Sequence, residues 1–361
     1  MADEWFVRVH DKEYGPVDLD TLRAWQGDGR VIATNELRRS GETDWILAGT
    51  VPELFPQPEQ IAAPAPEFFR ARTFSQIISD TVRLYLRGFR AFFALALLAG
   101  LPALALQLCL LFVDAREGQA LTLTSRLASS GAVLSLLLLL AMWPVFLGGL
   151  QFGVADAAAG RTPRLGDMLR RAMAHWRRIG KLCLFVYGSY LFWTMLPLLA
   201  VALVAATPSI PAILLALFAL AFQVYMVGRL FINFLFWQQS CTFGDLEGVE
   251  ALRDSKELAR SRRGDPWHER PLYRGAILAS LFLIVLLVFA VALEMPLMLL
   301  RLRHATTLED ALTMLQALAK SPPLDALTFA SYILSTVVNA ALRPLLGIAF
   351  VVLYFDAKAR L

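Results

Sequence analysis

Long apolar runs dominate the pattern of hydrophobic and polar positions along this chain of 361 residues. A helix of about 20 residues crosses the roughly 30 Å of hydrocarbon in a bilayer, and several of the runs reach that length. The pattern therefore predicts an all-α polytopic membrane domain at residues 73–361. Its six expected spans lie at about residues 92–113, 131–155, 181–206, 211–237, 275–300 and 327–354.

The residues before these runs have a pattern typical of a small α+β domain, which we expect at residues 1–56. "WFVRVH" at 5–10 mixes aromatic and β-branched residues and predicts a strand, and "YGP" at 14–16 predicts a turn. Asp18 precedes a helically spaced run that ends near Gly29, so we expect a capped helix there. "NELRRSGETDWILAG" predicts a β-hairpin.

Residues 57–72 are expected to link the two domains. "PELFPQPEQIAAPAP" at 52–66 contains five prolines, which stiffen a linker, and it is also a potential proline-rich ligand for the neighbouring domain. Residues 73–90 follow, with apolar side chains at three- and four-residue spacing and arginines between them. This spacing predicts a helix that lies in the headgroup region of the membrane. Its apolar positions are Phe74, Ile78, Val82, Tyr85 and Phe89.

The segment "WFVRV…EYGPVDLDTLRAW…GRV…LRRSGETDW…AGTVPELF" resembles the bacterial GYF-like domain. The resemblance implies a module that binds peptides, because an aromatic patch around the Gly-Pro motif of eukaryotic GYF domains grips proline-rich peptides. The residues it implicates in peptide contact are Tyr14, Gly15, Pro16, Trp25 and Trp45. A domain of this size also needs large aromatic side chains for its core, which is the alternative role of Trp25 and Trp45. Where the eukaryotic domain has its Gly-Tyr-Phe tail, this chain has "GDGRV".

Charge is distributed unevenly and predicts the orientation. The first 60 residues hold twelve acidic against six basic residues, although the whole chain has a net charge of +4. Of the Lys and Arg residues near the expected spans, 21 fall on one side and five on the other. Since the basic side of a membrane protein faces the cytoplasm, we expect both termini there, in a bacterial inner membrane. The start "MADEWFVRVH" lacks the features of a cleavable signal peptide.

Two basic loops between spans, "RLGDMLRRAMAHWRRIGKL" and "TFGDLEGVEALRDSKELARSRRG", predict further amphipathic helices at the membrane surface. "EALRDSKELARSRRG" and the terminal "VLYFDAKAR" are similar to elements of six-span proteins in the glycerophosphodiester phosphodiesterase membrane domain family. That family takes its name from members fused to a catalytic barrel. The present chain contains no such barrel, so the resemblance implies the membrane architecture and not the enzyme activity.

Polar residues inside spans are costly and mark candidate sites. Arg229, with Asn233 one turn later, and Arg343, with Asn339 one turn earlier, lie in the predicted cytoplasmic halves of their helices. The two arginines either share a vestibule for a lipid phosphate or another anion, or extend separately to the headgroups. Glu294 lies nearer the other membrane face, so we expect no pairing between it and the arginines.

No motif in the sequence predicts an enzyme, a cofactor or a metal site, and none is typical of nucleic-acid binding. Cys109, Cys183 and Cys241 are scattered over apolar segments, and the four histidines do not cluster. Two functional hypotheses remain. The first is a membrane adaptor or scaffold whose cytoplasmic domain binds a peptide partner. The second is a transporter or lipid-handling protein for an anionic or lipid-like substrate, regulated by the GYF-like domain, with an anionic lipid as a further expected partner.

Overall fold

The structure is a computed structural model. It describes residues 4–9, 12–32, 34–41, 44–51, 53–54, 68–113, 122–206, 209–244, 246–262, 264–303, 307, 309–310, 312–314, 316 and 323–361. The chain divides into two compact units, residues 1–62 and 63–361. Both predicted fold classes are confirmed, because a small antiparallel sheet domain precedes an all-helical body.

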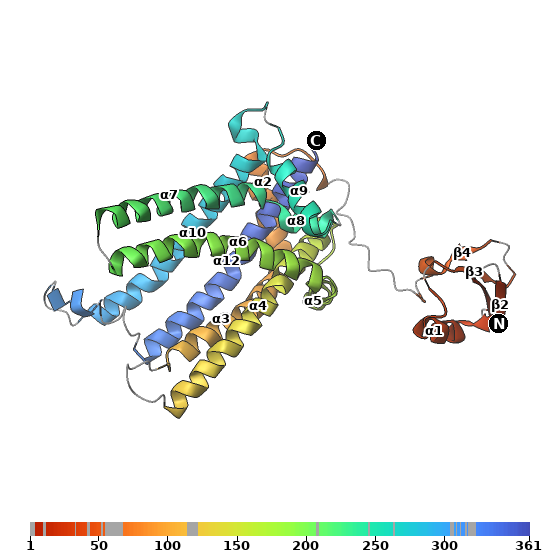
Figure 1. Cartoon of the computed structure of the whole chain (residues 1–361), viewed down its shortest axis with the longest axis horizontal. Helices are drawn as coiled ribbons and strands as arrows, with labels where there is room; N and C mark the ends of the chain where they lie inside the picture. Colours follow the sequence, from red (N-terminus) through yellow and green to blue (C-terminus); the bar gives the residue numbers. More distant parts are fainter. Residues whose placement is uncertain are drawn as a thin grey trace. The chain divides into compact units, whose positions relative to one another are not determined.

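The first unit is a four-stranded antiparallel sheet covered by one helix (Figure 1). The strand order is β2-β1-β3-β4, so β2 and β4 form the edges. Along β1, Trp5 and Val7 point towards α1 and are buried with Leu22, Val31 and Leu37 in one apolar core. The elements are β1 (Glu4–Val9), β2 (Lys12–Asp18), α1 (Leu19–Gly27), β3 (Glu36–Arg39) and β4 (Ile46–Leu47).

The predicted start and end of α1 are confirmed. The Asp18 carboxylate accepts a hydrogen bond from the backbone N–H of Thr21 at 3.0 Å, which satisfies one of the free donors in the first turn. Beyond the last turn, Gly29 has φ +72°, a conformation that glycine adopts without steric cost. The hairpin prediction is also confirmed, because β3 pairs antiparallel with β4.

The predicted turn at 14–16 is wrong. Tyr14, Gly15 and Pro16 lie inside β2, where the register with β1 shifts between the pairs Trp5–Val17 and Val7–Tyr14. Two residues of β2 therefore face one residue of β1, which is a β-bulge. Proline is tolerated here because a bulge on an edge strand does not require every backbone N–H.

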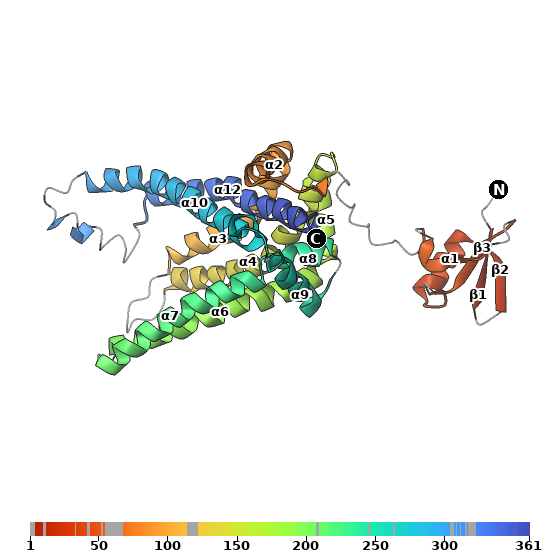
Figure 2. The same cartoon turned by 90° about the horizontal axis from the view of Figure 1, so that it is seen from above.

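Six of the described helices in the second unit are long and apolar enough to cross a membrane, which confirms the predicted spans. They form three antiparallel pairs, α3–α4, α6–α7 and α10–α12 (Figures 1 and 2). The helices are α2 (Phe74–Arg87), α3 (Phe89–Leu110), α4 (Leu123–Ala158), α5 (Leu165–Ala174), α6 (Trp176–Ala206), α7 (Ile210–Asn233), α8 (Trp237–Phe243), α9 (Gly248–Ala259), α10 (Pro271–Leu302) and α12 (Ala326–Lys358).

The protein core of the body is concentrated at one end. The carboxyl-terminal part of α4, from Pro144, and the last third of α12, from Ile348, are buried almost throughout. The short helices α5, α8 and α9 and the carboxyl terminus lie at the same end of the body (Figures 1 and 2). Elsewhere the long helices expose apolar side chains such as Leu137 and Leu287, which require lipid rather than water around them.

The segment before α2 is packed against the body and is not a free linker. Within the predicted linker 57–72, residues 57–67 lie outside the described residues. Phe68 and Arg72 are 7% and 1% exposed, and the Arg72 backbone N–H donates to Asp356 of α12 at 2.6 Å. Residues 68–72, the described part of the predicted linker, therefore pack with the helical body.

The helix predicted over 73–90 ends at Arg87, and Gly88 separates it from α3. Its amino terminus has a capping box, in which the Thr73 hydroxyl accepts from the Gln76 N–H and the Gln76 side chain accepts from the Thr73 N–H. Asp80 on this helix receives hydrogen bonds from Arg72, Arg70 and Arg83. Burial opposes ionisation of Asp80, but these partners outweigh it and hold its pKa below the usual value of 3.8.

Candidate functional site

A pocket of about 280 Å³ lies between the sheet of the first unit and the last turns of α1. Val7 and Val9 of β1 form its apolar side, and Tyr14 of β2 and Trp25 of α1 contribute aromatic side chains. The segment that follows α1 completes the lining with Arg30 and Val31. The pocket therefore offers flat aromatic surfaces, aliphatic contacts and one cation.

The strand pairing explains how Tyr14 reaches this pocket. Tyr14 pairs directly with Val7, so both side chains lie on the face of the sheet that packs against α1. Tyr14 is 48% exposed, whereas Trp25 is half-buried against the core. An exposed Tyr beside a partly buried Trp suits stacking against an apolar side chain of an extended peptide.

Gly15 and Pro16 shape the strand rather than line the pocket. A Cβ atom at Gly15 would lie 2.6 Å from the carbonyl oxygen of Trp5, and the φ of Gly15 is +138°, so only glycine fits. The bulge that Gly15 and Pro16 form sets where Tyr14 meets β1. Gly15 and Pro16 therefore position the strand beside the pocket, and their predicted contact with a peptide stays a prediction.

Trp45 lies on the opposite face of the sheet. Its ring is covered by the guanidinium of Arg8 at 3.9 Å and that of Arg38 at 5.1 Å from the ring centre. Arg8 alternates with Val7 along β1 and therefore points away from α1. The structure thus brings Tyr14 and Trp25 together and separates Trp45 from them.

Residues 5–54 match the family model of GYF domain 2. The match covers the predicted GYF-like domain and indicates a module for peptide binding. No curated protein and no solved structure matches the chain. The comparisons give no support to the resemblance between the helical body and the glycerophosphodiester phosphodiesterase membrane domain family, which stays a prediction.

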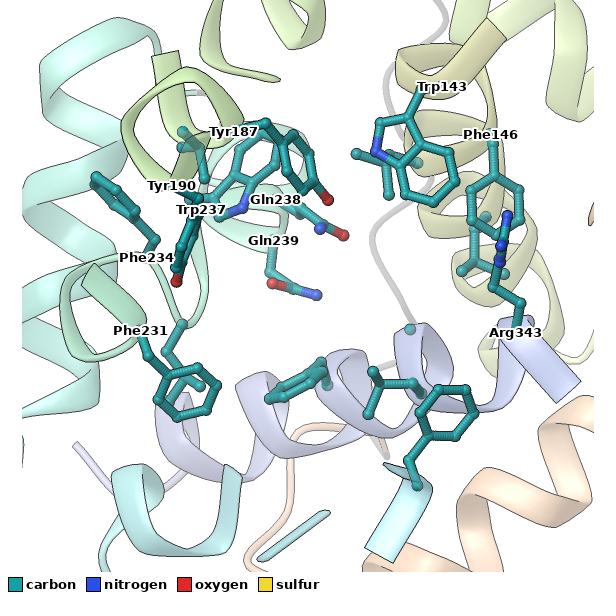
Figure 3. A pocket seen from close by; sticks show the side chains of 18 residues that line it. Trp143, Phe146, Tyr187, Tyr190, Phe231, Phe234, Trp237, Gln238, Gln239 and Arg343 are labelled. Atoms are coloured by element: carbon teal, nitrogen blue, oxygen red, sulfur yellow. The ribbon is translucent and has the colours of Figure 1, made fainter. Parts of the chain in front are cut away.

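A second pocket, also of about 280 Å³, lies among the long helices of the body (Figure 3). Its walls are aromatic, and Arg343 of α12 enters it from one side, where its guanidinium lies 5.3 Å from the ring centre of Trp143. Arg343 has no carboxylate partner among the residues that the structure describes. The labelled lining residues are Trp143, Phe146, Tyr187, Tyr190, Phe231, Phe234, Trp237, Gln238, Gln239 and Arg343.

Two glutamines of α8 supply amide groups to this pocket, and Figure 3 shows both pointing into the space between the aromatic walls. Gln238 Oε1 accepts a hydrogen bond from the Gln151 side chain of α4 at 3.2 Å. Gln239 is 2% exposed, and its Oε1 has no hydrogen-bond partner within the described part of the chain. Because an unsatisfied buried acceptor costs about 1–3 kcal/mol, Gln239 indicates a place for a donor from a bound molecule.

The other predicted intramembrane residues do not join Arg343. Arg229 is exposed on α7 and is not among the residues that line this pocket. Asn233 accepts from Arg260 at 3.5 Å, and Asn339 donates to the backbone carbonyl of Ser335 one turn earlier. Glu294 is exposed on α10 and is not among the residues that line the pocket.

Sequence reasoning missed the glutamines and most of the aromatic residues of the body pocket. One usable signal was present, because "WQQS" at 237–240 interrupts the apolar run that carries the fourth span. Paired amides at such a position are also costly in lipid, because each polar group needs a hydrogen-bond partner there. The aromatic residues gave no comparable signal, since the same side chains also face lipid along these helices.

Proposed function

We propose that this protein is a membrane-anchored adaptor whose GYF-like domain binds an extended peptide. The observation that carries this proposal is the pocket formed by Tyr14 and Trp25 within a domain that matches GYF domain 2. The same chain carries six helices able to cross a membrane, so a peptide held in this pocket is recruited to the membrane surface. The role requires no reaction chemistry, and we propose none.

Proline-rich peptides suit this pocket better than other sequences. Their extended helix is formed before binding, so they lose little entropy when their rings stack on flat aromatic side chains. We further propose that the membrane is the cytoplasmic membrane of a bacterium and that the peptide partner is cytoplasmic. The excess of Lys and Arg on the side that carries both termini supports this orientation.

Tyr14→Ala in the full-length protein tests the proposal, with an array of proline-rich and proline-free synthetic peptides as probes. We expect proline-rich peptides to bind the unchanged protein and Tyr14→Ala to weaken their affinity by about 30-fold, as the loss of an aromatic anchor does. Because Tyr14 is 48% exposed, the variant should unfold at nearly the same temperature. Fluorescence anisotropy of labelled peptides gives the affinities.

Trp45→Ala is the matched control, since it removes an aromatic side chain from the opposite face of the same sheet. It breaks the contacts with Arg8 and Arg38 and should lower stability while leaving peptide affinity unchanged. A loss of binding in Trp45→Ala but not in Tyr14→Ala would move the binding site to the other face. Absence of binding to every peptide in the array would refute the proposal.

The body pocket favours a second candidate function, the handling of an anionic amphiphile. Arg343 supplies a cation for the head of such a molecule, and the aromatic walls accept its apolar chain. A charge-assisted bond to arginine typically contributes about 1.5–3 kcal/mol. The combination fits a single-chain carboxylate better than a large polar solute.

A fluorescent fatty acid serves as the probe for this pocket. We expect Arg343→Gln to weaken its binding to the purified full-length protein by at least about tenfold, because one charge-assisted bond is lost. Arg229→Gln is the control, since it removes an equivalent charge from a neighbouring helix outside the pocket. Equal affinities in the two variants would contradict the assignment of the pocket.

A further inference from the structure

A third cavity, of about 690 Å³, opens where α6 enters the body beside α9. One wall comes from the end of α5 and the start of α6, and the other comes from the first turns of α9. Its lining residues are Ala174, His175, Arg177, Arg178, Lys181, Leu182, Phe185, Glu247, Gly248, Val249 and Leu252. We refer to this cavity as the basic groove.

Three basic side chains line the basic groove, and among the described residues only Arg178 has hydrogen-bond or ion-pair partners. Arg178 donates to the backbone carbonyls of Cys241 and Leu246 and lies 3.8 Å from the Glu247 carboxylate. Arg177 and Lys181 are exposed and have no hydrogen-bond or ion-pair partner among the described residues. They lie four residues apart, so both project from the same side of α6. The groove therefore carries two available positive charges after Glu247 offsets Arg178.

The order of side chains along α6 matches the order of groups in a phospholipid. Arg177 and Lys181 stand in the first turns of the span Trp176–Ala202, at the membrane boundary. Phe185, two turns after Arg177, faces the hydrocarbon and is 56% exposed, while Leu182 between them is buried at the base of the groove. With a rise of 1.5 Å per residue, residues 177 to 185 cover about 12 Å, enough to extend from a phosphate to the upper part of an acyl chain.

The α9 side of the groove also carries apolar side chains. Val249 is 73% exposed at the start of this helix, although it is apolar, and Leu252 lies one turn further on. The first turn of α9 also directs the positive end of a twelve-residue helix towards the groove, and Glu247 at its cap makes no side-chain capping bond. The α9 side thus contributes apolar contacts, while the cations that favour an anionic headgroup come from α6.

We propose that the basic groove binds the phosphate of an anionic phospholipid, with Arg177 and Lys181 as its ligands and Phe185 and Val249 against its acyl chains. This site is separate from the peptide pocket and from the Arg343 pocket, and the proposal does not depend on either function. A bound lipid would link α6 to α9 at the membrane surface and hold this end of the body against the bilayer.

Titration of the full-length protein in detergent with dihexanoyl phosphatidylglycerol tests the proposal. Trp176, which adjoins the groove and is 38% exposed, provides a fluorescence signal for binding. We expect saturable binding and a loss of affinity of about 30-fold in the double variant Arg177→Gln/Lys181→Gln, since each basic residue at a membrane surface contributes about 1 kcal/mol. Both positions are exposed, so the unfolding temperature should not change.

The control is Arg253→Gln/Lys256→Gln, which removes two exposed charges from α9 outside the groove. A change of less than about threefold in this variant supports a defined site, because it excludes a general effect of surface charge. Equal losses in the two double variants would overturn the proposal. It would also be overturned by equal binding of dihexanoyl phosphatidylcholine, or by displacement of the lipid by inorganic phosphate at the same concentration.

Discussion

At the scale of single residues, Asp356 holds the amino-terminal end of the body to its carboxyl-terminal end. This carboxylate is 1% exposed and accepts hydrogen bonds from the Arg72 backbone N–H, from Arg274 at 3.0 Å and from Arg360 at 2.9 Å. Arg274 and Arg360 also donate to the backbone carbonyl of Arg72. The segment before α2 is therefore held through its main chain by groups from α10 and α12.

We expect Asp356→Asn to lower the stability of the full-length protein by about 3 kcal/mol. The variant keeps the size of the side chain but leaves the guanidinium of Arg274, itself 4% exposed, without its buried counter-charge. Thermal unfolding in one detergent, followed by circular dichroism, measures the difference. The control is Asp167→Asn, which breaks an exposed pair with Arg170 and should cost less than about 1 kcal/mol. Equal changes in the two variants would show that the Asp356 contacts do not stabilise the body.

At the scale of secondary structure elements, helical spacing predicted α2 but not the face that it buries. The predicted stripe included Ile78 and Val82, which are 40% and 44% exposed. Tyr85, which also belongs to the predicted stripe, is buried and donates to the Ala341 carbonyl of α12, and Ile77 and Leu84 lie on the same face in contact with the body. Lipid and protein interior accept the same apolar side chains, so both faces of α2 are apolar. Spacing alone therefore could not show which face contacts the body and which faces lipid.

The strands show a similar limit for the candidate peptide site. Alternation along β1 predicts that Trp5 and Val7 share a face, and the resemblance to GYF-like domains implicated Tyr14, Trp25 and Trp45 as aromatic candidates. Which of these meet depends on the bulge at Gly15 and Pro16, which shifts the register of β2 by one residue. A shift of one residue moves side chains to the opposite face, and no local rule of sequence gives its position. The grouping of Tyr14 with Trp25 therefore required the structure.

At the scale of the whole molecule, the short helices and most of the paired charges gather at one end of the helical body. Asp156 of α4 pairs there with Arg161 and Arg171, and Asp254 of α9 pairs with Lys358 of α12 at 2.9 Å. The basic groove opens in the same part of the body, between α6 and α9. The sequence predicted the charge asymmetry correctly because it depends only on the order of spans and loops. It could not show that many of these arginines bind carboxylates rather than headgroups.

The orientation of this charged end in the membrane remains a prediction, and cysteine labelling tests it. In a chain without Cys109, we expect Arg170→Cys on α5 to react with a membrane-impermeant maleimide only after the membrane is permeabilised, because positively charged loops stay on the cytoplasmic side. Thr307→Cys, in the segment between α10 and α12, should react in intact cells. Both positions are exposed, while Cys183 and Cys241 are buried and should stay unlabelled. The reverse pattern would place the GYF-like domain and the basic groove on the outer side, where neither a cytoplasmic peptide nor a lipid of the inner leaflet could reach them.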